Sequence, residues 1–220
     1  MDSVGSSYVP AGSRPDAAGS RGAATGPRRV ATHATISAKI VVAGGFGVGK
    51  TTFVGSVSEI MPLTTEAVMT EASADYDDLS ATPNKVTTTV AMDFGRVSLD
   101  SDLILYLFGT PGQHRFWFMW DDLVRGAIGA VVLVDTRRLA DSFAAVDFFE
   151  DRGLPYVVGV NCFDGRLMHR LEDVREAMSI DPSIPIVSCD ARNRQSTKQT
   201  LIALVEHVLS LRRRATAPNV

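Results

Sequence analysis

The segment Gly44-Gly-Phe-Gly-Val-Gly-Lys-Thr-Thr52 (GGFGVGKTT) decides the fold of this chain. It matches the pattern G-x-x-x-x-G-K-[ST] and follows the apolar run Ile40–Ala43, which we expect to be a buried strand. Glycines let a backbone curl tightly around an anion, so that successive N–H groups converge on it. The segment therefore predicts a phosphate-binding loop between a strand and a helix, rather than a chance glycine-rich turn.

Two side chains of this loop have predicted chemical roles. Lys50 places a positive charge at the β- and γ-phosphates of a nucleotide and acts in catalysis, and the Thr51 hydroxyl is a candidate Mg²⁺ ligand. The helix that starts near Lys50 points its positive dipole end at the same phosphates. The residues predicted to bind the nucleotide here are Gly44, Gly45, Phe46, Gly47, Val48, Gly49, Lys50, Thr51 and Thr52.

Composition and charge exclude several classes of function. The 220 residues are 45% hydrophobic and 21% charged, as in ordinary soluble domains, and a net charge of −3 without a basic stripe argues against nucleic-acid binding. No apolar run approaches the roughly 20 residues of a membrane span. Cys162 and Cys189 are too few for a disulfide framework, so we expect a cytoplasmic protein whose thiols are buried spectators.

Residue composition divides the chain into three parts. Residues 1–35 are rich in Gly, Ala, Ser, Pro and Arg and almost lack large apolar side chains, which predicts a disordered basic tail. Residues 36–212 form the predicted domain, and residues 213–220 a flexible C-terminal tail.

Strands and helices alternate along the predicted domain, which indicates an α/β fold. We expect three layers, with helices on both faces of a mostly parallel sheet that has one antiparallel edge hairpin. Residues 62–85 lack a clear period and predict a loop. The expected strands span 36–43, 86–99, 103–108, 129–135, 156–161 and 185–188, and the expected helices span 51–61, 139–151, 171–178 and 196–212.

A second motif, Gly109-Thr-Pro-Gly112-Gln113, follows the strand predicted at 103–108. It resembles the second switch, D-x-x-G-Q, of the Ras-like small GTPases. That resemblance implies that the Gly112 N–H contacts the γ-phosphate and that Gln113 acts in catalysis by orienting the attacking water. Gly109 stands where those proteins have an aspartate that helps to hold Mg²⁺, so metal binding would fall on Thr51 and a switch threonine.

The switch threonine is expected in a third motif. The pattern T-x-x-x-D-F, from Thr89 to Phe94, resembles the first switch of Rab-like and bacterial polarity GTPases. The resemblance implies that Thr89 reaches Mg²⁺ and the γ-phosphate and acts in catalysis, with Thr87 or Thr88 as the alternative. Polarity GTPases carry an arginine just before this threonine. Thr88 stands there instead, and Arg115 is at most a weak substitute.

A fourth motif, Asn161-Cys-Phe-Asp164, follows the strand predicted at 156–161 and resembles the guanine-reading N-K-x-D motif. The resemblance implies that the Asp164 carboxylate accepts hydrogen bonds from guanine and that Asn161 ties its loop to the phosphate loop. Cys162 replaces the lysine that packs on the base. Downstream, Asp190-Ala191-Arg192 matches S-A-K, and the Ala191 N–H would meet the guanine O6.

The aromatic and methionine run Phe116–Trp120 comes directly after the second switch motif. Five consecutive large apolar residues cannot all face the core, so we expect some of them to form a surface for a partner protein.

Taken together, the four motifs resemble the Ras-like G domain, and most closely the GTPases of actinobacterial conservons and of bacterial polarity systems. This resemblance implies a slow GTP-hydrolysing switch in bacterial signal transduction that uses GTP or GDP with Mg²⁺. Its implied partners are a roadblock-type regulator and a sensor kinase, with membrane recruitment only through such partners. A nucleotide-locked scaffold without turnover and an ATP-using phosphotransferase remain alternatives.

Overall fold

The computed structural model describes residues 35–61, 63–64, 67–68, 87–88, 92–100, 102–112 and 114–216. The predicted N-terminal tail therefore lies, apart from Thr35, outside the described residues. The same holds for Thr89, Gln113, the last four residues and most of the loop predicted at 62–85.

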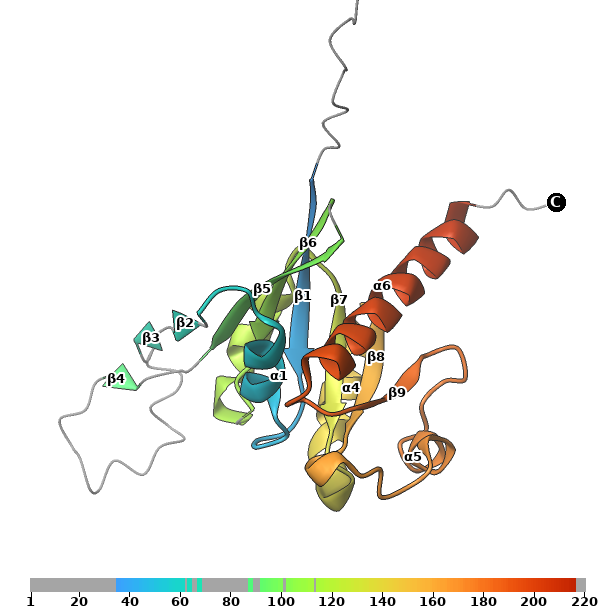
Figure 1. Ribbon diagram of the computed structural model, residues 1–220. Coiled ribbons are helices and arrows are strands. Elements are labelled where there is room, and N and C mark those ends of the chain that lie inside the picture. Colours follow the sequence, from blue (N-terminus) through green and yellow to red (C-terminus); the bar gives the residue numbers. More distant parts are fainter. Residues whose placement is uncertain are drawn as a thin grey trace, which may run out of the picture. The chain divides into compact units, whose positions relative to one another are not determined.

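A seven-stranded sheet forms the centre of the fold, in the order β2-β5-β6-β1-β7-β8-β9 (Figure 1). The strands β6, β1, β7, β8 and β9 run parallel, whereas β5 is antiparallel to β6 and β2 is antiparallel to β5. The strands are β1 (Ile36–Ala43), β2 (Leu63–Thr64), β5 (Asp93–Asp100), β6 (Leu103–Gly109), β7 (Ala127–Val134), β8 (Tyr156–Asn161) and β9 (Ile186–Cys189). The predicted sheet, with its β5–β6 hairpin, is confirmed.

Helices follow the strands in chain order. The α-helices are α1 (Lys50–Val57), α3 (Trp120–Val124), α4 (Phe143–Asp151), α5 (Leu171–Ala177) and α6 (Arg194–Thr216). Short 3₁₀ helices are η2 (His114–Met119), η3 (Thr136–Ser142) and η4 (Phe163–Gly165).

The two faces of the sheet pack into separate cores, which gives the predicted three layers. On β1, Ile40 and Val42 point to the side covered by α1 and α6, and Val41 and Ala43 point to the side of α3, α4 and α5. Alternate residues of a strand face opposite ways, and a sheet covered on both sides buries both sets. This is why GGFGVGKTT follows an unbroken apolar run.

Helix α1 is shorter than predicted. It ends at Val57, and Ile60 and Met61, which the periodicity placed on its buried face, are 37% and 86% exposed. The helix ends early because the backbone after Val57 forms hydrogen bonds with β5 instead of continuing the helix. The Ser58 hydroxyl accepts from the Arg96 N–H, and the Glu59 N–H donates to the Arg96 carbonyl at 2.7 Å. The chain after Val57 is thus held along the sheet before Pro62 is reached.

Three other boundaries differ from the predictions. The strand expected over 86–99 is divided, because β4 (Thr87–Thr88) pairs with β3 (Ala67–Val68) in a separate two-stranded sheet while β5 pairs with β6. The helix expected at 139–151 is preceded by η3, whose first turn is capped by the Asp135 carboxylate. The C-terminal helix α6 continues to Thr216, so the expected flexible tail from 213 is helical in its first four residues.

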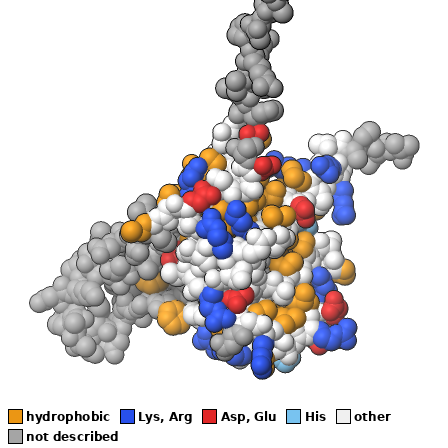
Figure 2. Space-filling model, in the orientation of Figure 1, with side chains coloured by type: hydrophobic (Ala, Val, Ile, Leu, Met, Phe, Trp, Pro, Cys, Tyr) orange, Lys and Arg blue, Asp and Glu red, His pale blue; other side chains and the backbone are white. Residues whose placement is uncertain are grey.

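Surface composition fits the expectation from net charge. On the face shown in Figure 2, Lys and Arg side chains are interspersed with Asp and Glu rather than gathered in one stripe. Among the helices of the described segments, none combines the length and apolarity needed to cross a bilayer.

Candidate functional site

The loop Gly44–Gly49 joins β1 to α1 and has the backbone that its glycines predict. Gly44, Gly47 and Gly49 have φ angles of 135°, 73° and 106°, which side-chain-bearing residues rarely adopt. Gly49 caps α1, and its carbonyl accepts the first helical hydrogen bond from Phe53 at 2.8 Å. The N-terminus of α1 thus points its free N–H groups toward the space enclosed by the loop.

Lys50 is the buried cation of this loop. Its Nζ donates to the carbonyls of Gly44 and Gly45 at 2.9 and 2.8 Å. Burial lowers the pKa of this ammonium group to about 8, and the Asp93 carboxylate partly opposes that shift. An anion within the loop would stabilise the charged form of Lys50.

Gly112 brings the segment after β6 against the phosphate loop. A Cβ atom at Gly112 would lie 2.6 Å from the Lys50 Nζ and 2.9 Å from the Phe46 Cα. No residue other than glycine therefore fits this approach, which places the Gly112 backbone beside Lys50. The predicted contact of the Gly112 N–H with a γ-phosphate stays a prediction.

Asp93 is a residue of this site to which sequence reasoning assigned no role. The Thr51 hydroxyl, predicted to be a metal ligand, donates a hydrogen bond to the Asp93 carboxylate at 2.8 Å. Asp93 was visible only as the aspartate of the T-x-x-x-D-F pattern. Its position opposite Gly109 depends on how β5 and β6 pair.

Asn161 joins the phosphate loop to the loop after β9. Its side-chain amide donates to the Val48 carbonyl at 2.8 Å, and its side-chain oxygen accepts from the Ala191 N–H at 3.1 Å. Gly49 permits this, because a Cβ there would lie 2.8 Å from the amide nitrogen. The Ala191 N–H expected to meet guanine is thus already bonded to Asn161, and it would have to exchange or share that partner.

Two adjoining cavities follow the phosphate loop, and they share Gly47, Gly49 and Thr52. The first, about 340 Å³ and here called the phosphate cavity, is lined by Phe46, Gly47, Gly49, Lys50, Thr51, Thr52, Asp93, Thr110, Pro111 and Gly112. The second, about 150 Å³ and here called the base cavity, is lined by Gly47, Gly49, Thr52, Asn161, Cys162, Phe163, Ala191 and Arg192. Described residues from each of the four motifs therefore line these two adjoining cavities.

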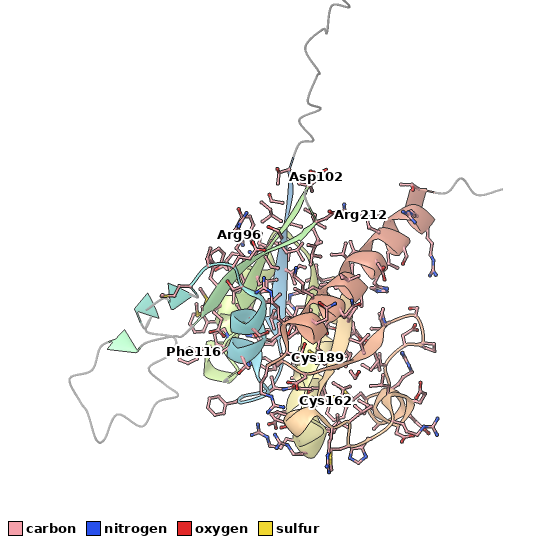
Figure 3. All side chains as sticks on the ribbon, viewed as in Figure 1. Arg96, Asp102, Phe116, Cys162, Cys189 and Arg212 are labelled. Atoms are coloured by element: carbon pink, nitrogen blue, oxygen red, sulfur yellow. The ribbon has the colours of Figure 1, made fainter. Side chains whose placement is uncertain are left out.

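The base cavity is lined by Cys162, which stands where the N-K-x-D motif has a lysine, and by the aromatic ring of Phe163. The Arg137 guanidinium lies 3.7 Å from the centre of the Phe163 ring and forms two hydrogen bonds with Asp135. Cys162 and Cys189 lie at the carboxyl ends of β8 and β9 (Figure 3), both buried, and burial raises the pKa of each thiol. The side chain of Asp164 lies outside the described residues.

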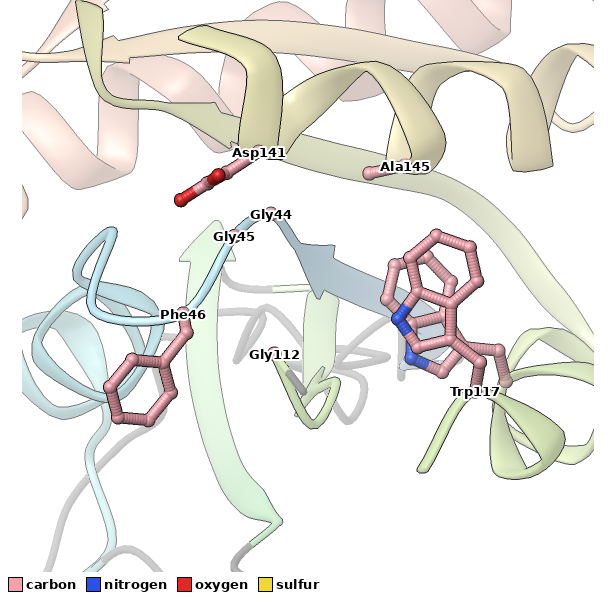
Figure 4. A pocket seen from close by; sticks show the side chains of 8 residues that line it. Gly44, Gly45, Phe46, Gly112, Trp117, Asp141 and Ala145 are labelled. Atoms are coloured by element: carbon pink, nitrogen blue, oxygen red, sulfur yellow. The ribbon is translucent and has the colours of Figure 1, made fainter. Parts of the chain in front are cut away.

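A third cavity of about 300 Å³ adjoins the phosphate loop at Gly44, Gly45 and Phe46 (Figure 4). In Figure 4, Phe46 and Trp117 stand on opposite sides of it, and Asp141 lies next to Gly45. Arg138, which the sequence patterns did not single out, donates to the Phe46 carbonyl at 2.6 Å and so holds the loop from η3.

The run Phe116–Trp120 is divided between core and surface. Phe116 and Trp120 are buried, and the Trp120 indole donates to the Pro111 carbonyl at 3.3 Å, whereas Phe118 is 52% exposed. The expectation that not all five residues face inward is confirmed. The side chains of Arg115 and Gln113 lie outside the described residues.

Comparison with known protein families finds a match over most of the chain. The model of one family, described as conserved hypothetical ATP binding protein, matches residues 42–211. An uncharacterized protein of Methanocaldococcus jannaschii is 28% identical over 128 residues, which are 57% of this chain and 70% of that protein.

Solved structures show the same fold at low sequence identity. The FeoB G-domain from Methanococcus jannaschii superposes with a TM-score of 0.53 and 12% identity, over 79% of this chain and 98% of that one. The cytosolic domain of the T. maritima FeoB iron transporter, in its GDP form, gives a TM-score of 0.56 and 14% identity. That comparison covers 79% of this chain and 64% of the transporter fragment. The fold is therefore that of a G domain.

Proposed function

We propose that this chain, which belongs to the family of conserved hypothetical ATP-binding proteins, is a cytoplasmic switch that binds GTP or GDP with Mg²⁺ and hydrolyses GTP slowly. In this proposal residues 36–212 form the nucleotide-binding unit. Its phosphate loop holds the triphosphate, and the loops after β8 and β9 hold the base.

The observation that carries the proposal is the bridge made by Asn161. Its amide links the Val48 carbonyl of the phosphate loop to the Ala191 N–H of the loop after β9. The bridge keeps the phosphate cavity and the base cavity adjoining, as one nucleotide requires. Asp164 follows three residues later, and a carboxylate there favours guanine, whose N1–H and N2 amine both donate.

The choice of base is tested by isothermal titration with GTP, GDP and ATP. We expect GTP and GDP to bind and ATP to bind at least about a hundredfold more weakly. Asp164→Asn should weaken GTP binding and favour xanthosine triphosphate, because xanthine carries a carbonyl where guanine carries an amine. Equal affinities for ATP and GTP would rule out guanine selectivity.

Binding of ATP is the second candidate function, and the description of the family favours it. Cys162 in place of a lysine also removes a side chain that packs on guanine in the proteins that the chain resembles. In this case ATP would bind in the same titration, and Asp164→Asn would leave its affinity unchanged.

Slow hydrolysis is proposed from the residues that accompany the phosphates. Lys50 would neutralise charge on the γ-phosphate, Thr51 and Thr89 would hold Mg²⁺, which when bound offsets phosphate charge, and Gln113 would orient the water. The position before Thr89 is a threonine and supplies no arginine. In a single-turnover assay, Gln113→Leu should reduce phosphate release about tenfold or more. The absence of Gln113-dependent phosphate release would favour the nucleotide-locked scaffold.

A role in bacterial signalling, beside a roadblock-type regulator and a sensor kinase, is supported by the resemblance to conservon and polarity GTPases. The exposed Phe118, which follows the second switch motif, provides apolar surface for such a regulator. Phe118→Asp should leave nucleotide binding unchanged and abolish binding of a roadblock partner in a pull-down with purified proteins.

A further inference from the structure

The strands β5 and β6 place Asp93 and Gly109 side by side. Phe94 pairs with Phe108 in the antiparallel register, so the next positions outward are Asp93 and Gly109. Gly109 is the position where the small GTPases that this chain resembles carry an aspartate. The carboxylate that is absent from β6 is therefore present on the neighbouring strand.

The two positions exclude each other sterically. A Cβ atom built at Gly109 would lie 2.9 Å from the Asp93 Oδ2 and 3.0 Å from the Asp93 Cβ. Real Cβ atoms do not tolerate the shorter of these distances. The space that a side chain at position 109 would use is thus filled by the Asp93 side chain, and glycine at 109 is what permits it.

Asp93 also makes the contact expected of a residue that supports a metal ligand. Its Oδ2 accepts a hydrogen bond from the Thr51 hydroxyl at 2.8 Å, and both residues line the phosphate cavity. A second polar group in the phosphate cavity, the Thr110 hydroxyl, indicates that a polar partner binds there. The Thr110 hydroxyl is buried, and no described residue forms a hydrogen bond with it.

These groups fit a hydrated divalent cation. Mg²⁺ takes oxygen ligands, retains several waters and is held in nucleotide sites by one or two protein oxygens together with phosphate oxygens. A hydroxyl, a carboxylate and a buried unsatisfied hydroxyl supply direct and water-mediated contacts of that kind. A buried hydroxyl without a partner is costly unless a water or ligand satisfies it.

We propose that Asp93 is the carboxylate that holds Mg²⁺ at this site, in the place that an aspartate at position 109 would otherwise take. The inference rests on the proposed nucleotide binding and adds to it a positioning residue on β5. The Thr51 hydroxyl and the Asp93 carboxylate then face the same ion, and the Thr110 hydroxyl faces its water shell.

The test measures how Mg²⁺ slows release of a fluorescent GDP from the full-length protein. Dissociation is followed by displacement with unlabelled GDP across a series of free Mg²⁺ concentrations. In Asp93→Asn, the concentration for half-maximal slowing should rise about ten- to hundredfold, as for other residues that support metal ligands. Asp100→Asn removes the same charge from the far end of β5 and should leave that concentration unchanged.

The decisive variant moves the carboxylate between strands. Asp93→Gly alone should lose most of the Mg²⁺ dependence, and Asp93→Gly combined with Gly109→Asp should regain it. Gly109→Asp alone should weaken the Mg²⁺ dependence, because Asp93 still fills the space that the new side chain needs. Thermal unfolding of each variant shows that the fold is intact. A recovery in the double variant is not expected if Asp93 only ties α1 to β5.

Two results would overturn the inference. One is an unchanged Mg²⁺ dependence in Asp93→Asn, and the other is a double variant as impaired as Asp93→Gly. Failure of the wild-type protein to bind fluorescent GDP would count against the proposed base and not against Asp93. In that case fluorescent ADP is used in the same measurement.

Discussion

At the scale of single residues, the site depends on positions that must lack a side chain. Gly112 is the sharpest example, because a methyl group there would enter the contact between the phosphate loop and the segment after β6. Its φ angle is not in the left-handed region, so the requirement comes from space alone.

Gly112→Ala should therefore affect ligand binding more than folding. The new Cβ would press on Lys50 and on the Phe46 backbone, and we expect nucleotide affinity to fall by about tenfold or more, or 1.4 kcal/mol. Gly153→Ala is the matched control. Gly153 has a φ of 59° and open space around it, so alanine should cost about 1 kcal/mol of stability and leave affinity unchanged. The opposite pattern in the two variants would refute this reading of Gly112.

His207 is a residue-scale feature outside the site. It is 7% exposed on α6, and its Nε2 has no hydrogen-bond partner within the described residues. Burial, and secondarily the charge of Arg214, lowers the pKa of this histidine below its usual value. Glu150 and Asp181 line the same cavity as the imidazole, but they do not reverse the shift.

The lowered pKa makes stability depend on pH. As the pH falls below about 6.5, His207 becomes protonated in the unfolded chain but stays neutral in the folded chain. The free energy of unfolding therefore decreases as the pH falls, until the pH is below the pKa of His207 in the folded chain. His207→Leu should remove this decrease and be at least as stable at neutral pH. Denaturant unfolding between pH 7.5 and 5.5 measures it, with the exposed His169→Gln as control. If His207→Leu and the wild type lost the same stability between pH 7.5 and 5.5, the pH dependence would come from groups other than His207.

At the scale of elements, the phosphate loop is held at two interior positions by different parts of the fold. Asn161 on β8 binds the Val48 carbonyl, and Arg138 on η3 binds the Phe46 carbonyl. The loop is thus shaped by contacts with segments about 90 to 110 positions later in the chain.

Asn161→Ala tests this arrangement. It leaves the Val48 carbonyl and the Ala191 N–H without their partner, which should cost about 2 kcal/mol of stability and at least about tenfold in nucleotide affinity. Asn161→Asp keeps an acceptor for Ala191 but places an oxygen against the Val48 carbonyl, so it should rescue neither property. Chemical denaturation and isothermal titration measure the two effects. Wild-type affinity in Asn161→Ala would show that the bridge is not needed for binding.

The sequence predicted elements best where local pattern and tertiary contacts agree. The strand at 156–161 matches β8 at both ends, because its apolar run is buried on both faces and ends at Asn161. The helix after the phosphate loop was extended four residues too far, because its apolar period continues through Ile60 and Met61 while the backbone turns to hydrogen-bond with Arg96. No local pattern reports that competition.

The site residues also divide into those that a local sequence pattern identifies and those that depend on contacts between distant segments. Lys50, Thr51, Gly112 and Asn161 were identifiable because each belongs to a motif with its own spacing. Asp93 and Arg138 were not, because their contacts with Thr51 and Phe46 come from strand register and from a turn after β7. Such contacts between distant segments leave no periodic trace in a single sequence.

At the scale of the whole molecule, a nucleotide that binds the folded chain alone must stabilise it. At a concentration about a hundredfold above its dissociation constant, the gain is about 2.7 kcal/mol, which corresponds to a rise of about 5–10 °C in the melting temperature. We expect this rise with GTP and GDP in the presence of Mg²⁺ and a much smaller one with ATP. The reverse order of nucleotides would favour the ATP-binding alternative.

The placement of the two tryptophans has a consequence for spectroscopy. The chain contains only Trp117 and Trp120, and both lie in the segment that follows Gly112, with ring centres 5.2 Å apart. Trp120 is anchored to Pro111 through its indole N–H, so a displacement of that segment changes the surroundings of both chromophores. The tryptophan emission of the unlabelled protein, excited selectively over its tyrosines, therefore reports on one short segment, and a stopped-flow fluorimeter can follow its movement without any attached dye.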